Sequence, residues 1–287
     1  MCKVISDNET YLKGMRNTYH DKSWFMSIIP EEIDMIIDFG CADGSFIEYM
    51  KKNWPDYSYY GVEENEEFLK ACKDKGIEAC KSIQEVVTKL AGHLDKTLLV
   101  MNSVLHEVYT YKGAYEAEQL WHVFSNNGIK YIALRDMYAK GCGVFSSKTQ
   151  DELYDVCRKK DKHVSANNGE FIALGEKLDD FERQWGEVSN GYNMTHFLLK
   201  YFYNMNWERE LVENYIPFHY RELHEAIREV GYDITYENFY SLPWLKQKWL
   251  NDFDCDTHPA LHSFIARVLT HMKLFLKFEN FEDTSSN

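Results

Sequence analysis

Short apolar runs alternate with stretches of helical spacing through the first half of the chain. The runs are too short for helices, and each indicates a buried strand; they end near Ile37, Val62, Cys80, Met101 and Leu134. Between them, apolar residues recur every three or four positions, which is typical of amphipathic helices. Strands that alternate with helices in this way predict an α/β fold with a mostly parallel sheet.

The first strand is followed by a turn that contains two glycines. The apolar run Met35–Ile37 ends in Asp38, Gly40 and Gly44 bracket the turn, and a helix begins at Ser45. A nicotinamide fingerprint would require G-x-G-x-x-G, and a Walker loop would require Gly-Lys-Ser/Thr. The turn has neither pattern, yet it lies at the carboxyl end of a strand, where such folds bind their ligands.

The segment Asp38–Phe46 resembles motif I of the class I S-adenosylmethionine-dependent methyltransferases. The resemblance implies a doubly wound, mostly parallel seven-stranded sheet with an antiparallel last strand. It also implies that S-adenosylmethionine is the cofactor and that its methionine half is bound by Asp38, Gly40, Cys41, Ala42 and Gly44. A carboxylate at the strand end suits the sulfonium cation of this cofactor. Ala42 departs from the family, which usually has glycine at that position.

The second predicted strand, Tyr57–Glu63, ends in an acid. Glu63 lies about 20–25 residues beyond the loop, near the position where an acid accepts hydrogen bonds from a ribose diol. In the resembled family an acid at this position binds both ribose hydroxyls. Asn65 is a good N-cap, and Glu66 and Glu67 then occupy the first turn of the next helix, where the helix dipole favours negative charge. We therefore assign Glu63 to the ligand.

Two further segments carry candidate site residues. Ser82 and Ile83 follow the short third strand, where the family places its adenine contacts; a plain loop into the next helix explains them equally well. Asn102 follows the fourth strand, and Asn102–Tyr109 resembles the motif after strand four in small-molecule methyltransferases, so Asn102 joins the predicted cofactor site. His106 and Glu107 are the candidate bases for an acceptor hydroxyl. A structural hydrogen bond is the alternative role for His106.

The regular alternation ends after the fifth strand, Ile129–Leu134, and Arg135 and Asp136 behind it predict a local ion pair. Residues 138–216 are too many for one loop and predict a helical insert. Its expected helices are Asp151–Lys162, Phe171–Trp185 and Met194–Tyr215. We expect the insert to cover the carboxyl edge of the sheet as a cap and to help bind the methyl acceptor. Its aromatic residues could instead form a core of its own.

The alternation returns after the insert. A helix is predicted at Tyr220–Gly231, the sixth strand at Tyr232–Tyr236 and the seventh, antiparallel in the resembled family, at Leu261–Val268. The predicted organisation is an N-terminal helical segment over 1–30, a methyltransferase-like domain over 31–137 and 217–270, the insert over 138–216 and a C-terminal tail over 271–287.

Composition narrows the functional classes. The chain has 287 residues, of which 45% are hydrophobic, and a net charge of −14. It contains no apolar stretch of about 18 residues and no signal-peptide pattern, which favours a cytoplasmic protein without membrane contact. The seven cysteines form no C-x-x-C pair, which argues against a disulfide framework and a zinc site, and no metal is expected. The acidic net charge disfavours nucleic acid as a binding partner. Only the basic run Arg158–His163 favours such a partner.

Together these patterns predict an S-adenosylmethionine-dependent methyltransferase that acts on a small molecule. An RNA or protein methyltransferase is one alternative, and a non-catalytic S-adenosylmethionine-binding partner protein is another. The sequence leaves the acceptor and the oligomeric state open.

Overall fold

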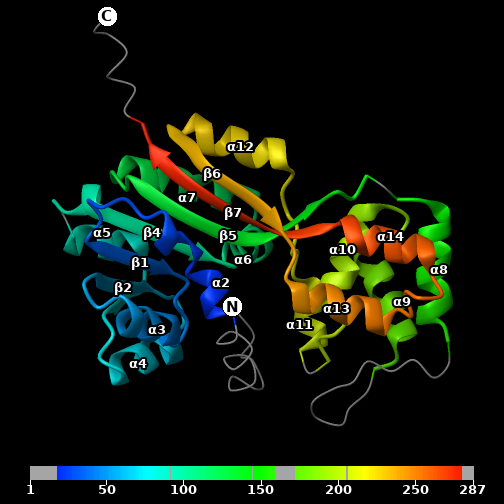
Figure 1. Cartoon of the computed structure of the whole chain (residues 1–287). Helices are drawn as coiled ribbons and strands as arrows, with labels where there is room; N and C mark the ends of the chain where they lie inside the picture. Colours follow the sequence, from blue (N-terminus) through cyan, green and yellow to red (C-terminus); the bar gives the residue numbers. More distant parts are fainter. Residues whose placement is uncertain (1–17, 91, 144, 160–171, 205, 280–287) are drawn as a thin grey trace, which may run out of the picture. The chain divides into compact units, whose positions relative to one another are not determined.

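A computed structural model describes residues 18–90, 92–143, 145–159, 172–204 and 206–279 (Figure 1). Parts of three predicted features lie outside the described residues: residues 1–17 of the N-terminal helical segment, Lys160 to His163 of the basic run, and residues 280–287 of the C-terminal tail. Among the described residues, no helix is both long and apolar enough to cross a membrane.

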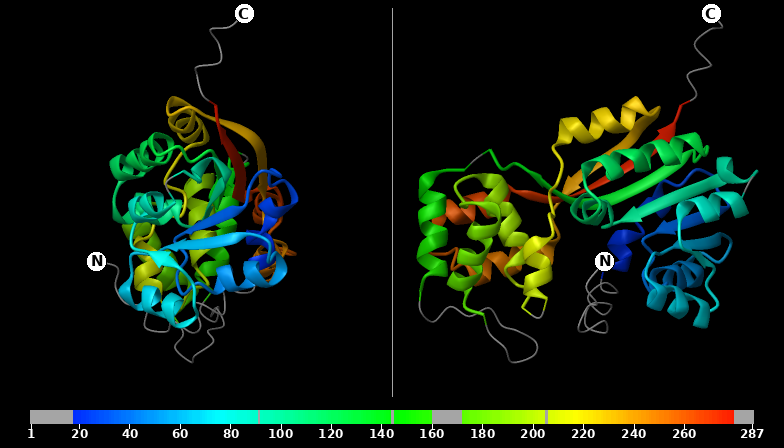
Figure 2. Two further views of the ribbon diagram at one scale, coloured as in Figure 1. Left: turned by 90° about the vertical axis from the view of Figure 1, so that its left-hand side faces the viewer. Right: turned by 180° about the vertical axis from the view of Figure 1, so that it is seen from behind.

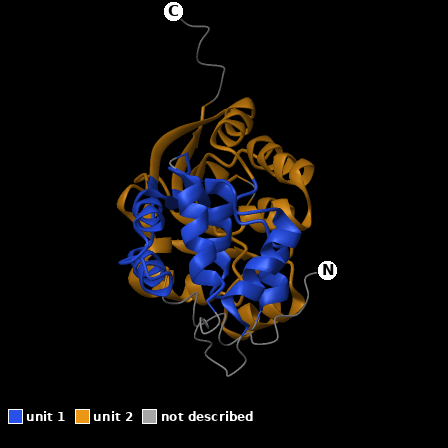
Figure 3. Ribbon diagram, turned by 90° about the vertical axis from the view of Figure 1, so that its right-hand side faces the viewer, with its two compact units in different colours: residues 1–7, 137–217, 239–272 blue, residues 8–136, 218–238, 273–287 orange. Residues whose placement is uncertain are grey.

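The chain divides into two compact units, which Figure 3 colours separately. We call residues 8–136, 218–238 and 273–287 the sheet unit, and residues 1–7, 137–217 and 239–272 the helical unit.

The strands form one seven-stranded sheet in the order β3-β2-β1-β4-β5-β7-β6. They are β1 (Met35–Phe39), β2 (Ser58–Val62), β3 (Ala79–Cys80), β4 (Thr97–Asn102), β5 (Tyr131–Lys140), β6 (Tyr232–Tyr240) and β7 (Leu269–Phe278). The first five pair in parallel. The N–H of Phe278 donates to the carbonyl of Lys130 (2.8 Å) and that of Glu279 to the carbonyl of Gly231 (3.0 Å), so the end of β7 meets the starts of β5 and β6. The last strand is therefore antiparallel, and the predicted fold class is confirmed.

Helices cover both faces of the sheet (Figure 2). On one face, Phe46 of α3 (Ser45–Asn53) and Cys72 of α4 (Glu66–Asp74) share a buried cluster with Ile36 of β1. On the other face, Phe124 of α7 (Ala114–Asn126) packs edge-on against Phe39, with ring centroids 5.7 Å apart. Both faces are buried because successive side chains of a strand point to opposite sides. The other helices of this unit are α2 (Tyr19–Lys22), η1 (Trp24–Ser27), α5 (Ile83–Lys89), η2 (Leu94–Lys96), α6 (Leu105–Tyr111) and α12 (Tyr220–Glu229).

The ends of α4 agree with the sequence. The Asn65 side chain accepts the N–H groups of Glu67 and Phe68, as predicted for an N-cap. Gly76 has a φ of +67°, and the Ile77 N–H returns to the Cys72 carbonyl at 2.9 Å, the closing bond of a helix that ends in a left-handed glycine.

The helical unit is built around its own apolar core. Its helices are α8 (Ser147–Cys157), α9 (Leu174–Trp185), α10 (Gly191–Lys200), α11 (Trp207–Val212), α13 (Pro243–Asp252) and α14 (Pro259–Arg267). Leu153 of α8, Phe181 of α9, Phe197 of α10, Trp249 of α13 and Phe264 of α14 are buried together. The aromatic residues Phe197, Tyr201 and Tyr215 belong to this core. A core of the insert's own was one of the two roles expected for them; the other was to help bind the methyl acceptor.

The prediction of the seventh strand at Leu261–Val268 is wrong. Pro259 begins helix α14, whose residues Leu261, Phe264 and Ile265 are buried at helical spacing. The seventh strand follows at Leu269–Phe278, mostly within residues assigned to the tail. A short apolar run does not by itself distinguish a strand from a buried helix, and the proline at the first helical position was the local signal that would have decided it.

The prediction of one helix over Met194–Tyr215 is also wrong, because the chain breaks between α10 and α11. The Lys177 side chain is buried at this break, where its ammonium donates to the carbonyl oxygens of Tyr201 (2.6 Å) and Tyr203 (2.9 Å). These carbonyls follow the end of α10, where helical partners run out. A buried cation on a neighbouring helix thus provides hydrogen bonds for the carbonyl groups at the helix break. The spacing of apolar residues within the segment could not reveal this distant partner.

Residues 239–272 cluster with the helical unit rather than with the sheet unit, unlike the predicted boundaries. The physical reason is the shared core, to which α13 and α14 contribute Trp249, Phe253, Leu261 and Phe264. Removing residues 138–216 alone would therefore expose the apolar faces of α13 and α14 to water.

The glycine at position 61 leaves room for a cysteine of the β1 loop. A Cβ at Gly61 would overlap the Cys41 Sγ and lie 3.2 Å from the Ala79 Cβ. We predict that Gly61→Ala lowers the free energy of unfolding by roughly 1–3 kcal/mol, measured by urea titration. Cys41→Ala should recover at least about 1 kcal/mol of this loss in the double variant. Strictly additive effects would contradict the predicted overlap.

Candidate functional site

The register of the parallel strands brings three loops to one level. Phe39 of β1 pairs with Val62 of β2 and with Met101 of β4. The next residue of each strand is therefore Gly40, Glu63 or Asn102, side by side at the carboxyl edge. The strand order reverses between β1 and β4, which is the point where open α/β sheets bind ligands. Three of the predicted site segments thus meet at this edge.

The loop after β1 presents its backbone rather than its side chains. Cys41 is buried, with its Sγ 4.0 Å from that of Cys72, so its side chain points into the core. Gly40 has a φ of +81°, and a Cβ there would lie 2.8 Å from Val104 Cγ2. Gly44 has a φ of +74° and forms the N-cap of α3. The positive φ and the closeness of Val104 each require a glycine at position 40, whether or not a ligand is bound.

Two non-glycine residues with positive φ lie in the loops at this edge. Ala42 has a φ of +46° in the loop after β1, and Ser103 has a φ of +58° in the loop after β4. Such conformations cost energy and persist where the surroundings fix them, which is common at binding sites. The alanine that departs from the family pattern therefore adopts the conformation that a glycine would adopt.

Glu63 links the loops after β1 and β2. Its Oε2 accepts the N–H of Ala42 at 3.0 Å, and its Oε1 accepts the N–H of Asn65 at 2.8 Å. Burial raises the pKa of Glu63, and these two backbone N–H groups oppose that rise. A carboxylate has about four acceptor positions, so two remain for a ligand. The neighbouring acids are used elsewhere: Glu66 pairs with Lys81 and Glu64 with Lys112.

Asp38 is buried in β1, two residues before the loop. Burial raises its pKa to about 7, the Lys22 ammonium opposes this rise, and the Glu63 carboxylate adds to it. Two partly desolvated acids at one strand edge create a negative potential that favours a cationic ligand group.

The Asn102 side chain has both its amide nitrogen and its amide oxygen buried without a hydrogen-bond partner among the described residues. Buried polar atoms are nearly always hydrogen-bonded, so an amide without partners at a strand edge calls for a ligand or an ordered water. Its donor and acceptor could bind either charge of an amino acid group.

His106 and Asp136 form a buried pair. The His106 Nδ1 lies 2.6 Å from the Asp136 Oδ1, while the Asp136 Oδ2 accepts the N–H groups of Leu105 at 2.8 Å and His106 at 3.2 Å. An ionised carboxylate only accepts, so Nδ1 carries a proton, and in the neutral ring Nε2 carries none.

The predicted ion pair between Arg135 and Asp136 is wrong. Both lie inside β5, which extends to Lys140, and adjacent strand residues point to opposite faces. The Arg135 Nε donates to the Asp21 Oδ2 at 2.6 Å, and its Nη1 donates to the Ser103 Oγ at 2.7 Å. Sequence reasoning missed Asp136 as the partner of His106; the short length given to the fifth strand hid the alternation that separates the two residues.

The remaining predicted residues are Ser82, Ile83 and Glu107. Ser82 is the N-cap of α5, where its hydroxyl accepts the N–H of Glu85 at 3.3 Å, and Ile83 is buried in the core. Their adenine contacts stay a prediction. Glu107 is half-buried next to His106, and its charge acts on Lys22. Its catalytic role also stays a prediction.

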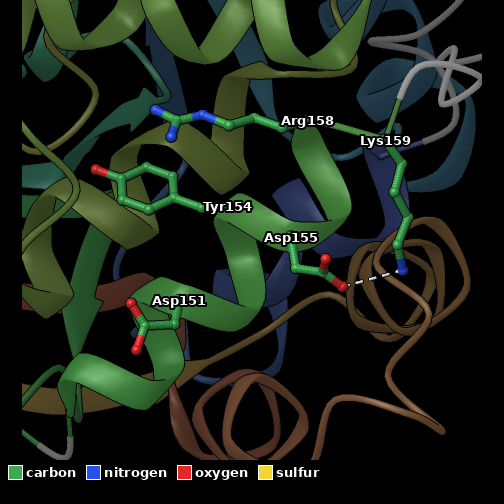
Figure 4. A pocket seen from close by; sticks show the side chains of 5 residues that line it. All are labelled: Asp151, Tyr154, Asp155, Arg158 and Lys159. Carbon is green, nitrogen blue, oxygen red and sulfur yellow. Dashed lines mark ion pairs between the residues drawn. The ribbon is translucent and has the colours of Figure 1, made fainter.

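A separate hollow of about 430 Å³ lies on α8 of the helical unit, lined by Asp151, Tyr154, Asp155, Arg158 and Lys159 (Figure 4). Three of its charged groups contact other residues of the lining. Lys159 pairs with Asp155 at 3.1 Å, and the Arg158 guanidinium lies 4.5 Å from the centre of the Tyr154 ring. None of the predicted site residues lines it.

No family model matches the sequence, and no curated protein matches it either. Solved structures that resemble the chain include a SAM dependent methyltransferase from Archaeoglobus fulgidus, with 13% identity, coverage of 94% of this chain and 100% of that one, and a TM-score of 0.47. The plantazolicin methyltransferase BamL in complex with SAH shares 9% identity over 95% and 87% of the two chains, with a TM-score of 0.46. PKMT2 from Rickettsia typhi in complex with AdoHcy shares 13% sequence identity, with coverage of 87% of this chain and 50% of that one, and a TM-score of 0.48.

The Asp136 carboxylate is expected to fix the tautomer of His106. In protein labelled with ¹⁵N-histidine, the ring nitrogens of His106 should show Nδ1 protonated and Nε2 unprotonated at pH 8. Asp136→Asn should shift this resonance pair toward the Nε2–H form while leaving the exposed His122 unchanged, because an amide can donate to Nδ1. A neutral His106 with its proton on Nε2 in the unmodified protein would contradict the assignment.

Proposed function

We propose that the protein is an S-adenosylmethionine-dependent methyltransferase. The observation that carries the proposal is the meeting of Asp38, Glu63 and the unpartnered Asn102 amide at the switch point of the sheet, with Glu63 bonded to the loop after β1. This group of residues has the polarity that the cofactor requires. A nucleoside with a cationic amino acid tail offers a diol, a sulfonium and an ammonium, and the edge offers two carboxylates and an amide.

Each residue would hold a different part of the cofactor. Glu63 has acceptor positions left for a ribose diol after its two backbone bonds. Asp38 supplies negative charge next to the turn for the cationic half of the ligand. The backbone of Gly40 to Gly44 lines the turn, since Cys41 points into the core. Bound S-adenosylmethionine would supply an activated methyl group, so the protein needs chiefly to align the acceptor and manage its proton.

The acceptor is proposed to be a small molecule whose reacting group loses a proton. In support, His106 is held by Asp136 in the tautomer that leaves Nε2 as the base. A basic macromolecular interface gains little support, because Arg158 and Lys159 are engaged within α8. The covering of the acceptor by the helical segment 138–216 stays a prediction.

Replacing Glu63 by glutamine tests the ribose contact. The change keeps the shape but removes the charge and one acceptor from two charge-assisted hydrogen bonds, each worth about 1.5–3 kcal/mol. Glu63→Gln should therefore weaken the binding of S-adenosylhomocysteine by at least tenfold in calorimetric titration.

Glu66→Gln is the matched control, since Glu66 is an exposed acid of the same segment that pairs with Lys81. It should change the affinity less than about twofold. Equal losses from the two variants would show that the wrong acid has been assigned. If the unmodified protein binds neither S-adenosylmethionine nor S-adenosylhomocysteine at millimolar concentration, the proposed function is wrong.

A further inference from the structure

The short helix α2 places a lysine against the carboxyl edge of the sheet. The position of α2 is fixed by the contacts of two residues that precede that lysine. Tyr19 packs against the rings of Phe46 (5.4 Å) and Tyr49 (5.3 Å). Asp21 accepts hydrogen bonds from Arg135 and from Lys273, both at 2.6 Å. Lys22 is the last residue of this anchored turn, and its side chain is only 7% exposed.

The Lys22 ammonium has no hydrogen bond and no ion pair with the residues that the structure describes. Other lysines of the sheet unit differ in this respect: Lys273 pairs with Asp21, and Lys75 pairs with Asp43 at 2.8 Å. Burying a cation without a direct partner is costly, and native proteins avoid it unless a ligand supplies the partner. Because α2 is anchored, its backbone cannot move to bring the Lys22 ammonium into water.

Charged groups from several elements act on the Lys22 ammonium. Burial lowers its pKa to about 8, as does the charge of Arg135, whereas Asp38, Glu107 and Asp21 act in the opposite direction. The acids that act on the Lys22 ammonium thus belong to β1, to α6 and to α2 itself, and the hydrogen bond from Arg135 to Asp21 places α2 against β5. The ammonium stays largely protonated at neutral pH, as an anion-binding group must.

Lys22 and Asp38 present opposite charges at one end of the proposed cofactor site. An amino acid group carries the complementary pair, a carboxylate and an ammonium. A lysine ammonium can bind such a carboxylate through charge-assisted hydrogen bonds.

We propose that Lys22 binds the carboxylate of the amino acid end of the bound cofactor, beside Asp38 and the amide of Asn102. The proposal rests on the proposed function. It assigns to the N-terminal segment a direct part in ligand binding, in addition to the packing role that Tyr19 and the fully buried Phe25 perform.

The test compares two ligands that differ only in this carboxylate: S-adenosylhomocysteine and S-adenosyl-3-thiopropylamine, its decarboxylated form. Calorimetry measures both with the unmodified protein, Lys22→Met, Lys22→Arg and the control Lys112→Met. Lys112 is an exposed lysine of the same unit that pairs with Glu64. Lys22→Met should fold with a melting temperature no lower than that of the unmodified protein, since a buried charge without a direct partner is replaced by an apolar side chain of similar length.

The expected result is a loss of about tenfold to a hundredfold for S-adenosylhomocysteine in Lys22→Met, with less than a threefold change for the decarboxylated ligand. Lys22→Arg should retain part of the difference between the two ligands, and Lys112→Met all of it. Unchanged affinity for S-adenosylhomocysteine, or equal losses for both ligands, would overturn the proposal for Lys22 while leaving the proposed function standing. Failure of the unmodified protein to bind either ligand would instead overturn the proposed function.

Discussion

The parallel register of β1 with β2 and β4 is the constraint on which the site depends. Because Phe39 pairs with both Val62 and Met101, the loops that follow these strands begin at the same level. The Glu63 carboxylate then ties two of these loops together through the N–H groups of Ala42 and Asn65. A shift of one residue in either pairing would move Glu63 or Asn102 away from the turn and reverse the faces of the strand.

The sequence predicted the elements whose signals are local. The strand, glycine turn and helix around Asp38–Phe46 and the N-cap Asn65 have backbone requirements that few residue types satisfy. The choice of Glu63 over its neighbours also followed from local rules, because the helix dipole and surface pairing account for Glu66. Its role toward a ligand remains a proposal.

The sequence could not predict features that depend on distant partners. The break between α10 and α11 is satisfied by Lys177, on a different helix. The pairing of Asp136 with His106 depends on how far β5 extends, since the alternation of the strand sends Arg135 to the opposite face. The seventh strand was predicted at the residues of α14 because α14 and β7 are both short apolar runs. The two differ in the spacing of their apolar residues rather than in composition.

The central claim is that the carboxyl edge of β1, β2 and β4 binds an adenosyl amino acid. The most direct measurement is a crystal structure of the full chain with S-adenosylhomocysteine. The account predicts the ribose hydroxyls within about 3 Å of the Glu63 carboxylate, and a polar group of the ligand within the same distance of the Asn102 amide. A nucleoside bound away from the loops after β1 and β2, with Glu63 bonded only to Ala42 and Asn65, would contradict it.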